Sequence, residues 1–254
     1  MEHDRKIEEL NAELKAYREH FTDFIESAAH DLHAPLRKIS VLVERLITKR
    51  EPVFDGDAKE YVKRIQSCIA EMKLLIDGLT ELAMANAGND EFRACDLNVI
   101  LGETLAVMDD EIKEKKVVIK LHPLPVIRGN DFQYRQLFRN VLENAIKFSR
   151  ENAPLQIDVN ARPITEGEKN SLKLDKQKEY HKIVFEDNGI GFDNSYKEKI
   201  FEPFIRLHAR SHYHGSGLGL AICKKIVMNH KGIIYADGIE NGGARFVLIL
   251  PESP

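Results

Sequence analysis

The sequence of 254 residues contains no tryptophan, only three cysteines, and no apolar run approaching the ~20 residues that a membrane-spanning helix needs. Its polar beginning does not resemble a signal peptide. Cys68, Cys95 and Cys223 are far apart and lack any CxxC spacing, so we expect unpaired thiols in a reducing compartment. The formal net charge of −4 provides no basic field for nucleic acid or anionic membranes. We therefore expect a cytoplasmic protein that binds no nucleic acid, whose parent could still be membrane-attached through a segment outside this sequence.

The first 50 or so residues carry a helical repeat. Apolar residues recur in alternating steps of three and four, as in the seam of a coiled coil. The seam runs through Ile7, Leu10, Leu14, Tyr17, Phe21, Phe24 and Ala28. It then shifts by one residue and continues through Leu32, Leu36, Ile39, Val43 and Leu46. In either frame His30 lies off the seam, so we expect its imidazole to face solvent or the flank of a neighbouring helix.

A turn at Pro52 and Gly56 separates this helix from a second one over about residues 59–86. The apolar stripe of the second helix consists of Val62, Ile65, Ile69, Met72, Ile76 and Leu79. Two antiparallel helices cannot bury both stripes fully by themselves, whereas two such hairpins can. The sequence therefore predicts a multidomain protein that begins with an all-α helical hairpin, which forms a dimeric four-helix bundle as a homodimer.

After a linker at residues 86–90, helices and strands mix. Helices are predicted over residues 97–114, 131–149 and 217–230, and strands over 117–121, 126–129, 155–161, 181–187, 232–238 and 244–251. This order is typical of an α+β domain, an α/β sandwich of helices on a mostly antiparallel sheet. The polar insert over residues 163–180 is predicted to be a loose hairpin loop, with Tyr180 and His181 at the surface.

The stretch "QLFRNVLENAIKFS" places polar side chains on one side of a helix. Asn140 and Asn144 are four residues apart and share a face, and Lys147 lies one turn further on. Amide oxygens suit a hard cation such as Mg²⁺, and a lysine can meet a phosphate as a point charge. Taken alone, the same pattern also fits an ordinary polar helix face.

Two glycine motifs follow in the second half of the chain. In "FEDNGIGF", Asp187 ends an apolar strand and Gly189 and Gly191 allow close approach of the backbone to a flat ligand. The carboxylate could accept a hydrogen bond from an exocyclic amine such as that of adenine. By itself the motif is also explained by a turn that ends a strand.

In "GSGLGLAICKKIV", glycines precede or open a helix whose N-terminal amides favour an anion. These are Gly215, Gly217 and Gly219. A plain turn into a helix is the alternative. The polar stretch between the two glycine motifs is long enough for a lid over a bound nucleotide.

Together with the Phe-x-Pro-Phe segment at residues 201–204, these motifs occur in one order that resembles the ATP-binding domain of sensor histidine kinases, within the wider gyrase, Hsp90 and MutL family. "AAHDLHAPLRKIS" resembles the phosphoacceptor region of those kinases, especially of the phytochrome-like branch. The resemblance covers about residues 20–251. It implies a coiled-coil signalling helix at 1–20, a dimerisation and histidine phosphotransfer domain at 21–88, and a catalytic ATP-binding domain at 89–254.

The resemblance also implies a function and a nucleophile. The chain would be an ATP-dependent protein histidine kinase that autophosphorylates on His30 and passes the phosphoryl group to an aspartate of a response-regulator receiver domain. Asp31 would orient the histidine ring and hold its proton, Pro35 would bend the helix, and Arg206 would steady the transferring phosphate. An upstream sensor domain would lie outside this sequence.

For the nucleotide, the resemblance implies that Asn144 binds Mg²⁺ and Asp187 reads the adenine amino group, with Gly189 and Gly191 shaping the pocket. The remaining ATP-binding residues would be Asn140, Lys147, Phe148, Phe204, Gly215, Gly217, Leu218 and Gly219. The alternative function is a nucleotide-binding switch that has lost its chemistry.

Some histidines and one alanine fall outside these roles. His30, Asp31 and His33 could be imagined as a metal site, but we expect His33 to be an exposed flank residue. His208, His212 and His214 could bind metal or sense pH, but a solvated stretch is the simpler interpretation. Ala34 replaces the Thr or Asn that family members use to dephosphorylate their partner, so we expect weak phosphatase activity.

Overall fold

A computed structural model describes residues 2–50, 56–86, 92–150, 152–207, 215–240 and 242–254. The chain divides into two compact units. The first contains a helical hairpin made of α1 (Glu2–Arg50) and α2 (Gly56–Asn86), and the second is an α/β domain. The predicted order, a hairpin followed by an α/β domain, is confirmed. In the described part of the chain, no helix is both long enough and apolar enough to cross a membrane.

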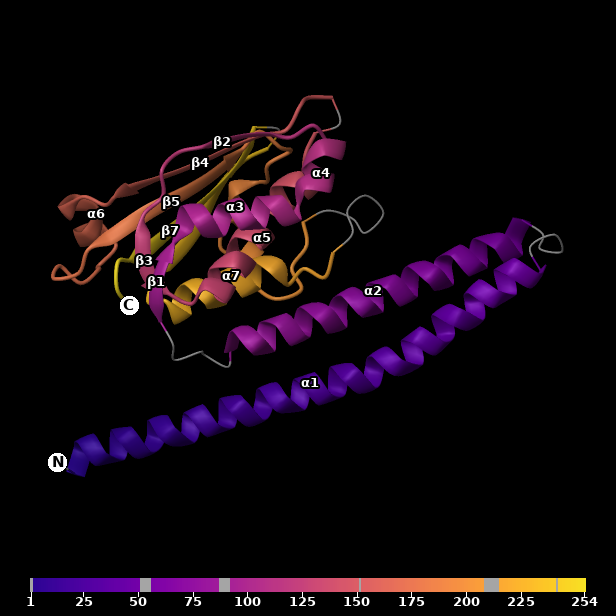
Figure 1. The fold of residues 1–254 in the computed structure, drawn as a ribbon, viewed down its shortest axis with the longest axis horizontal. Helices are drawn as coiled ribbons and strands as arrows, with labels where there is room; N and C mark the ends of the chain where they lie inside the picture. Colours follow the sequence, from indigo (N-terminus) through magenta and orange to yellow (C-terminus); the bar gives the residue numbers. More distant parts are fainter. Residues whose placement is uncertain (1, 51–55, 87–91, 151, 208–214, 241) are drawn as a thin grey trace. The chain divides into compact units, whose positions relative to one another are not determined.

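The hairpin encloses a small apolar core. Leu36 and Val43 of α1 pack with Val62 and Ile69 of α2. The α1 helix runs without interruption through Pro35 and curves gently along its length (Figure 1). The predicted turn residue Pro52 lies outside the described residues.

Each predicted seam is only partly buried inside the hairpin. In α1, Leu36 and Val43 are buried while Leu32, Ile39 and Leu46 are exposed. In α2 the same alternation holds, with Val62 and Ile69 buried and Ile65, Met72 and Leu79 exposed. Each heptad therefore contributes one side chain to the hairpin core and presents another to the outside.

Near the start of the hairpin, the stripe that packs against α2 differs from the predicted seam by one position. The buried residues are Thr22, Ile25 and Ala29, whereas Phe21 and Phe24 of the predicted seam are exposed. The Thr22 hydroxyl donates to the carbonyl oxygen of Ala83, 3.2 Å away, close to the end of α2. A helix inside a bundle has two apolar flanks, and the repeat alone does not say which flank meets which neighbour.

The sheet of the α/β domain has five strands in the order β2-β4-β5-β7-β6. Their bounds are β2 Val118–Leu121, β4 Gln156–Pro163, β5 Tyr180–Asp187, β6 Ile233–Ile239 and β7 Gly243–Pro251. Only the β2–β4 pair is parallel, so the mostly antiparallel sheet is confirmed. A separate two-stranded antiparallel sheet joins β1 (Arg93–Asp96), which was not predicted, to β3 (Val126–Gly129).

Helices α3 (Leu97–Val107), α5 (Asp131–Lys147) and α7 (Gly219–Asn229) form a layer on one face of the sheet (Figure 1). Phe138 of α5 packs against Phe185 of β5, with their ring centroids 5.4 Å apart. The single helix predicted over residues 97–114 is wrong: Met108 ends α3, and a separate α4 (Asp109–Glu114) follows. Met108 is buried, and its N–H bonds back to the last turn of α3.

The polar insert is not a loose loop, because it contains the helix α6 (Glu166–Ser171). Thr165 and Glu168 form a capping box, in which each side chain accepts a hydrogen bond from the other residue's backbone N–H. Lys169 is only 2% exposed, and its ammonium group lies 2.9 Å from a carboxylate oxygen of Glu166 and 3.3 Å from one of Glu179. The capping-box residues Thr165 and Glu168 are visible in the sequence, but the polar, lysine-rich composition around them favoured the prediction of a loop.

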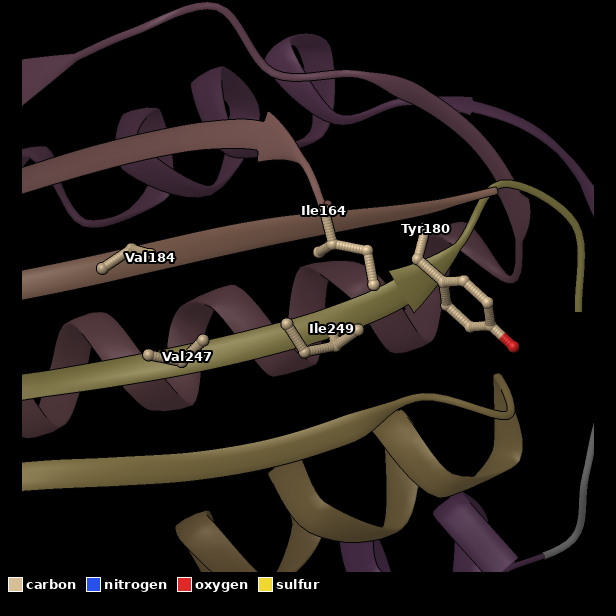
Figure 2. Packing of buried hydrophobic residues seen from close by; sticks show 5 residues of the cluster. All are labelled: Ile164, Tyr180, Val184, Val247 and Ile249. Carbon is tan, nitrogen blue, oxygen red and sulfur yellow. The ribbon is translucent and has the colours of Figure 1, made fainter. Parts of the chain in front are cut away.

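The insert also helps to cover a second apolar cluster on the sheet (Figure 2). Its buried members are Ile164, Tyr180, Val184, Val247 and Ile249, and Leu172 and Leu174 of the insert pack against them. The expectation that Tyr180 is a surface residue is therefore wrong, because it is 5% exposed.

Candidate active site

His30 lies on the outside of α1, as predicted, with its side chain 87% exposed. Its Nδ1 is 3.4 Å from Oδ1 of Asp31, which is itself 80% exposed. When Nδ1 carries the proton, the ring donates it toward this carboxylate and leaves Nε2 unprotonated. In that tautomer the pair presents one nucleophilic nitrogen to solvent.

The expectation that His33 is an exposed flank residue is wrong. Its side chain is 31% exposed, and its Nε2 is 3.1 Å from Oδ1 of Asp77 on α2. Across the described ranges, no three His, Cys, Asp or Glu side chains gather in a way that could hold a metal ion. His208, His212 and His214 lie outside the described residues.

Helix α5 positions the predicted Asn-Asn-Lys face. Asn130 caps the helix by accepting a hydrogen bond from the N–H of Gln133. Asn140 is 9% exposed, and its Nδ2 is buried without a hydrogen-bond partner in the described structure. An unsatisfied buried amide is costly, so this donor is suited to meet a ligand. Asn144 and Lys147 follow on the same helix and are partly exposed.

Two cations lie close enough to affect each other at the end of α5. Burial lowers the pKa of Lys147, and the positive charge of Arg206 lowers that pKa further, while Glu143 opposes both effects. The Lys147 ammonium group also lies 4.7 Å from the centroid of the Phe148 ring. Two neighbouring positive charges can together attract an anion, so this region suits a phosphate group.

Asp187 ends β5 as predicted, and its side chain is partly buried. Its Oδ1 accepts hydrogen bonds from the N–H groups of Gly189, at 2.8 Å, and Ala244, at 3.3 Å. Burial raises the pKa of Asp187, although these two bonds oppose the rise. Among the described residues, no hydrogen bond reaches Oδ2, so this oxygen is the one available to a ligand.

The glycines after Asp187 pack the loop against the end of α5. A Cβ on Gly189 would lie 2.6 Å from the carbonyl oxygen of Phe148, which also accepts a 2.9 Å hydrogen bond from the N–H of Ile190. Gly191 has a φ of 64°, and a Cβ there would collide with the carbonyl oxygen of Ile239. Only glycine fits both positions without strain.

The third motif reaches α5 through Gly219, the first residue of α7. A Cβ at this position would lie 3.4 Å from Oδ1 of Asn140. Gly217 has a φ of 73° and Leu218 is fully buried, while Gly215 is partly exposed. The structure therefore places Gly219 beside Asn140.

The predicted lid contains two short 3₁₀ helices, η2 (Asn194–Tyr196) and η3 (Lys199–Phe201). Phe204 follows them with a φ of 64° and an exposed side chain. A positive φ is unfavourable for a bulky residue and is often found where a loop must change shape or meet a ligand.

Arg150 contacts the loop after Asp187, and sequence reasoning missed it. Its Nε donates a 2.9 Å hydrogen bond to the carbonyl oxygen of Gly189, and its charge slightly lowers the pKa of Asp187. The only signal was its place just after the predicted helix, which did not distinguish it from other surface arginines.

Comparison with known proteins agrees with this geometry. Residues 22–88 match the His Kinase A (phospho-acceptor) domain, and residues 129–254 match the histidine kinase-, DNA gyrase B- and HSP90-like ATPase family. The chain is 30% identical over 247 residues to the phytochrome-like protein Cph1 of Synechocystis, covering 97% of this chain but only 30% of that protein.

Two solved structures share the fold. Full-length ShkA in complex with AMPPNP superposes with a TM-score of 0.60 and 21% identity, over 90% of this chain and 45% of ShkA. Histidine kinase ThkA in complex with the response regulator protein TrrA gives a TM-score of 0.55 and 18% identity, over 93% of this chain and 64% of ThkA. The chain therefore belongs to the sensor histidine kinase family and carries its phosphoacceptor domain and its ATP-binding domain.

Proposed function

We propose that this chain transfers the γ-phosphoryl group of ATP to His30. The observation that carries the proposal is the pairing of an 87% exposed imidazole with an adjacent carboxylate that can hold Nδ1, in a chain that also contains an ATPase-family domain. In the reaction, a bond forms between Nε2 of His30 and the γ-phosphorus, and the bond from that phosphorus to the β–γ bridging oxygen breaks. ADP leaves with that electron pair. Asp31 stabilises the positive charge that develops on the ring.

The α/β domain has the residues to hold the nucleotide. We assign the adenine amino group to Oδ2 of Asp187 and the phosphates to Lys147 and Arg206, whose positive charges lie close together. The orphaned Nδ2 of Asn140 supplies a further donor. Asn144, whose amide oxygen suits a hard cation, would hold Mg²⁺ near the phosphates. A bound Mg²⁺ would neutralise charge that develops on the phosphate oxygens.

We assign the glycine residues Gly215 and Gly217, with Leu218, to the phosphate side of this site and Phe204 to its lid, as the family resemblance implies. Gly189, Gly191 and Gly219 belong to the same site through their close packing against other backbone or side-chain atoms of the domain. Phe148 contributes its carbonyl oxygen to the loop after Asp187.

The hairpin is proposed to dimerise through the apolar side chains that it leaves exposed. One member of each heptad faces outward, among them Leu32, Ile39, Ile65, Met72 and Leu79. Four antiparallel helices with such stripes form a common core. In the proposed division, residues 1–20 are a coiled-coil signalling helix, 21–88 the dimerisation and phosphotransfer domain, and 89–254 the catalytic domain.

The proposed acceptor of the phosphoryl group from His30 is an aspartate on a response-regulator receiver domain. The family match supports this partner, as does the structure of the relative ThkA in complex with the response regulator protein TrrA. Because the chain spans only 30% of the length of its relative Cph1, an input domain elsewhere in the parent protein is also proposed.

The test is incubation of the purified chain with γ-labelled ATP and Mg²⁺, comparing wild type with His30→Ala. Acid-labile, base-stable label that is present in wild type and absent from His30→Ala supports the kinase. A His30→Ala chain that still binds ATP serves as the control for folding. Nucleotide binding without any labelling of wild type would instead support a non-catalytic switch.

A further inference from the structure

His33 forms a polar contact between the two helices of the hairpin, one turn beyond the proposed phosphoacceptor. Its Nε2 lies 3.1 Å from Oδ1 of Asp77 on α2, and the two side chains are 31% and 58% exposed. The two side chains form an ion pair across the hairpin when the His33 ring is protonated. The contact therefore fixes the ring of His33 against a residue that is distant in the sequence.

The contact falls on a weak turn of α1. Pro35 has no N–H, so the carbonyl oxygen of Asp31 lacks the donor that residue 35 supplies in an ordinary helix. His33 lies between these two residues. The turn that begins with His30 and Asp31 therefore has one backbone hydrogen bond fewer, and it is there that a side chain ties α1 to α2.

Resting on the kinase activity proposed above, we infer that His33 is a positioning residue for phosphoryl transfer to His30. Through Asp77 it restrains the turn weakened by Pro35 and so holds the direction in which the His30 ring projects from the hairpin. In-line attack on a phosphorus depends on that direction, because catalysis of phosphoryl transfer is mainly alignment. His33 touches neither the nucleotide nor the reacting atoms in this scheme.

The same contact favours His30 over His33 as the acceptor. Nε2 of His33 faces a carboxylate oxygen of Asp77, whereas His30 meets its own carboxylate through Nδ1. His33 thus helps to position His30 and does not compete with it for the phosphoryl group.

The test compares single-turnover phosphorylation of the full chain at saturating ATP and Mg²⁺. The variants are His33→Ala, Asp77→Ala, the double alanine variant, and the swap that combines His33→Asp with Asp77→His. A partly exposed pair contributes at most about 1 kcal/mol, so each alanine variant should react about fivefold more slowly. The double variant should fall no further, the ATP KM should stay the same, and the swap should recover most of the rate.

Ser40→Ala provides the matched control. Ser40 accepts a 3.4 Å hydrogen bond from Lys73, so it also links α1 to α2, but it lies beyond the turn of Pro35. Its removal should leave the rate within about twofold of wild type. Wild-type rates in His33→Ala and Asp77→Ala, or an equal loss in Ser40→Ala, would overturn this inference alone. A wild-type chain that takes no phosphate would overturn the proposed function and this inference with it.

Discussion

Replacing Asp187 with asparagine should weaken ATP binding while leaving the fold intact. The asparagine oxygen can still accept from the N–H groups of Gly189 and Ala244, which both bond to Oδ1 in the wild type. What changes is the second oxygen, which becomes an amide donor. A hydrogen bond to a charged acceptor contributes about 1.5–3 kcal/mol to binding. In the variant the adenine amino group would face the asparagine amide, which is also a donor, and this adds a further penalty to the binding free energy. We expect the Kd for ATP to rise about 100-fold.

The same substitution should alter the choice of base. Inosine triphosphate carries an oxygen where adenine carries its amino group, so it repels the Asp187 carboxylate but can accept from an asparagine amide. Titration calorimetry with both nucleotides on both proteins should therefore show a strong ATP preference in wild type that shrinks or reverses in Asp187→Asn. An unchanged preference in a folded variant would refute the assignment of this carboxylate to the base.

Stability provides an independent check on Asp187. Burial raises its pKa above the ordinary value of 3.8, so the folded state disfavours the ionised form. The penalty is absent at a pH below 3.8, where the group is protonated in both states, and it is complete above the raised pKa. Urea unfolding should thus find Asp187→Asn at least as stable as wild type at neutral pH, with the advantage disappearing on acidification. A variant that is clearly less stable at pH 7 would contradict the buried-charge argument.

Four further substitutions test individual residues. Gly191→Ala should destabilise the domain by about 2–4 kcal/mol in urea unfolding, because its φ is 64° and a Cβ would strike a neighbouring carbonyl. By contrast Gly102→Ala, on an open face of α3, should stabilise it by about 0.5–1 kcal/mol. Burial lowers the pKa of His230 below 6.5, so wild type should lose stability as the pH falls below 6.5 toward that lowered pKa, and His230→Leu should lack this component. Asp31→Asn should slow phosphorylation about 100-fold without changing the ATP KM, as measured by single-turnover labelling.

The sequence placed the residues proposed for the nucleotide site on the elements where the structure has them, but it did not reveal their neighbours. Asn140, Asn144 and Lys147 follow from helical spacing, and Asp187 from its place at the end of an apolar strand. Such patterns involve residues close together in the sequence, so they can be recognised without knowing the fold. The contribution of Arg150 depends on a hydrogen bond to a loop far along the chain, and no local pattern reports it.

The second apolar cluster shows the same limit for the fold. Tyr180 follows a run of charged residues, which is typical of a surface, yet it is 5% exposed because Leu172 and Leu174 of the insert help to cover that face of the sheet. The sequence alone does not show whether the insert folds back onto the sheet and covers part of this face. The capping-box pattern of Thr165 and Glu168 is the feature of the sequence that indicates a helix in the insert.

The two histidines of the phosphoacceptor turn show what the fold adds to a motif. His30 and His33 share one sequence context, and heptad spacing places neither of them on the apolar seam. Only the hairpin separates them, because α2 brings Asp77 to the second ring and leaves the first 87% exposed. Nucleophilicity requires a free, unprotonated nitrogen, and the carboxylate beside each histidine decides which nitrogen that is. Asp31 adjoins His30 in sequence and contacts Nδ1, whereas Asp77 approaches Nε2 of His33 across the hairpin. The proposal of His30 as the acceptor thus depends on which helix supplies the carboxylate to each histidine.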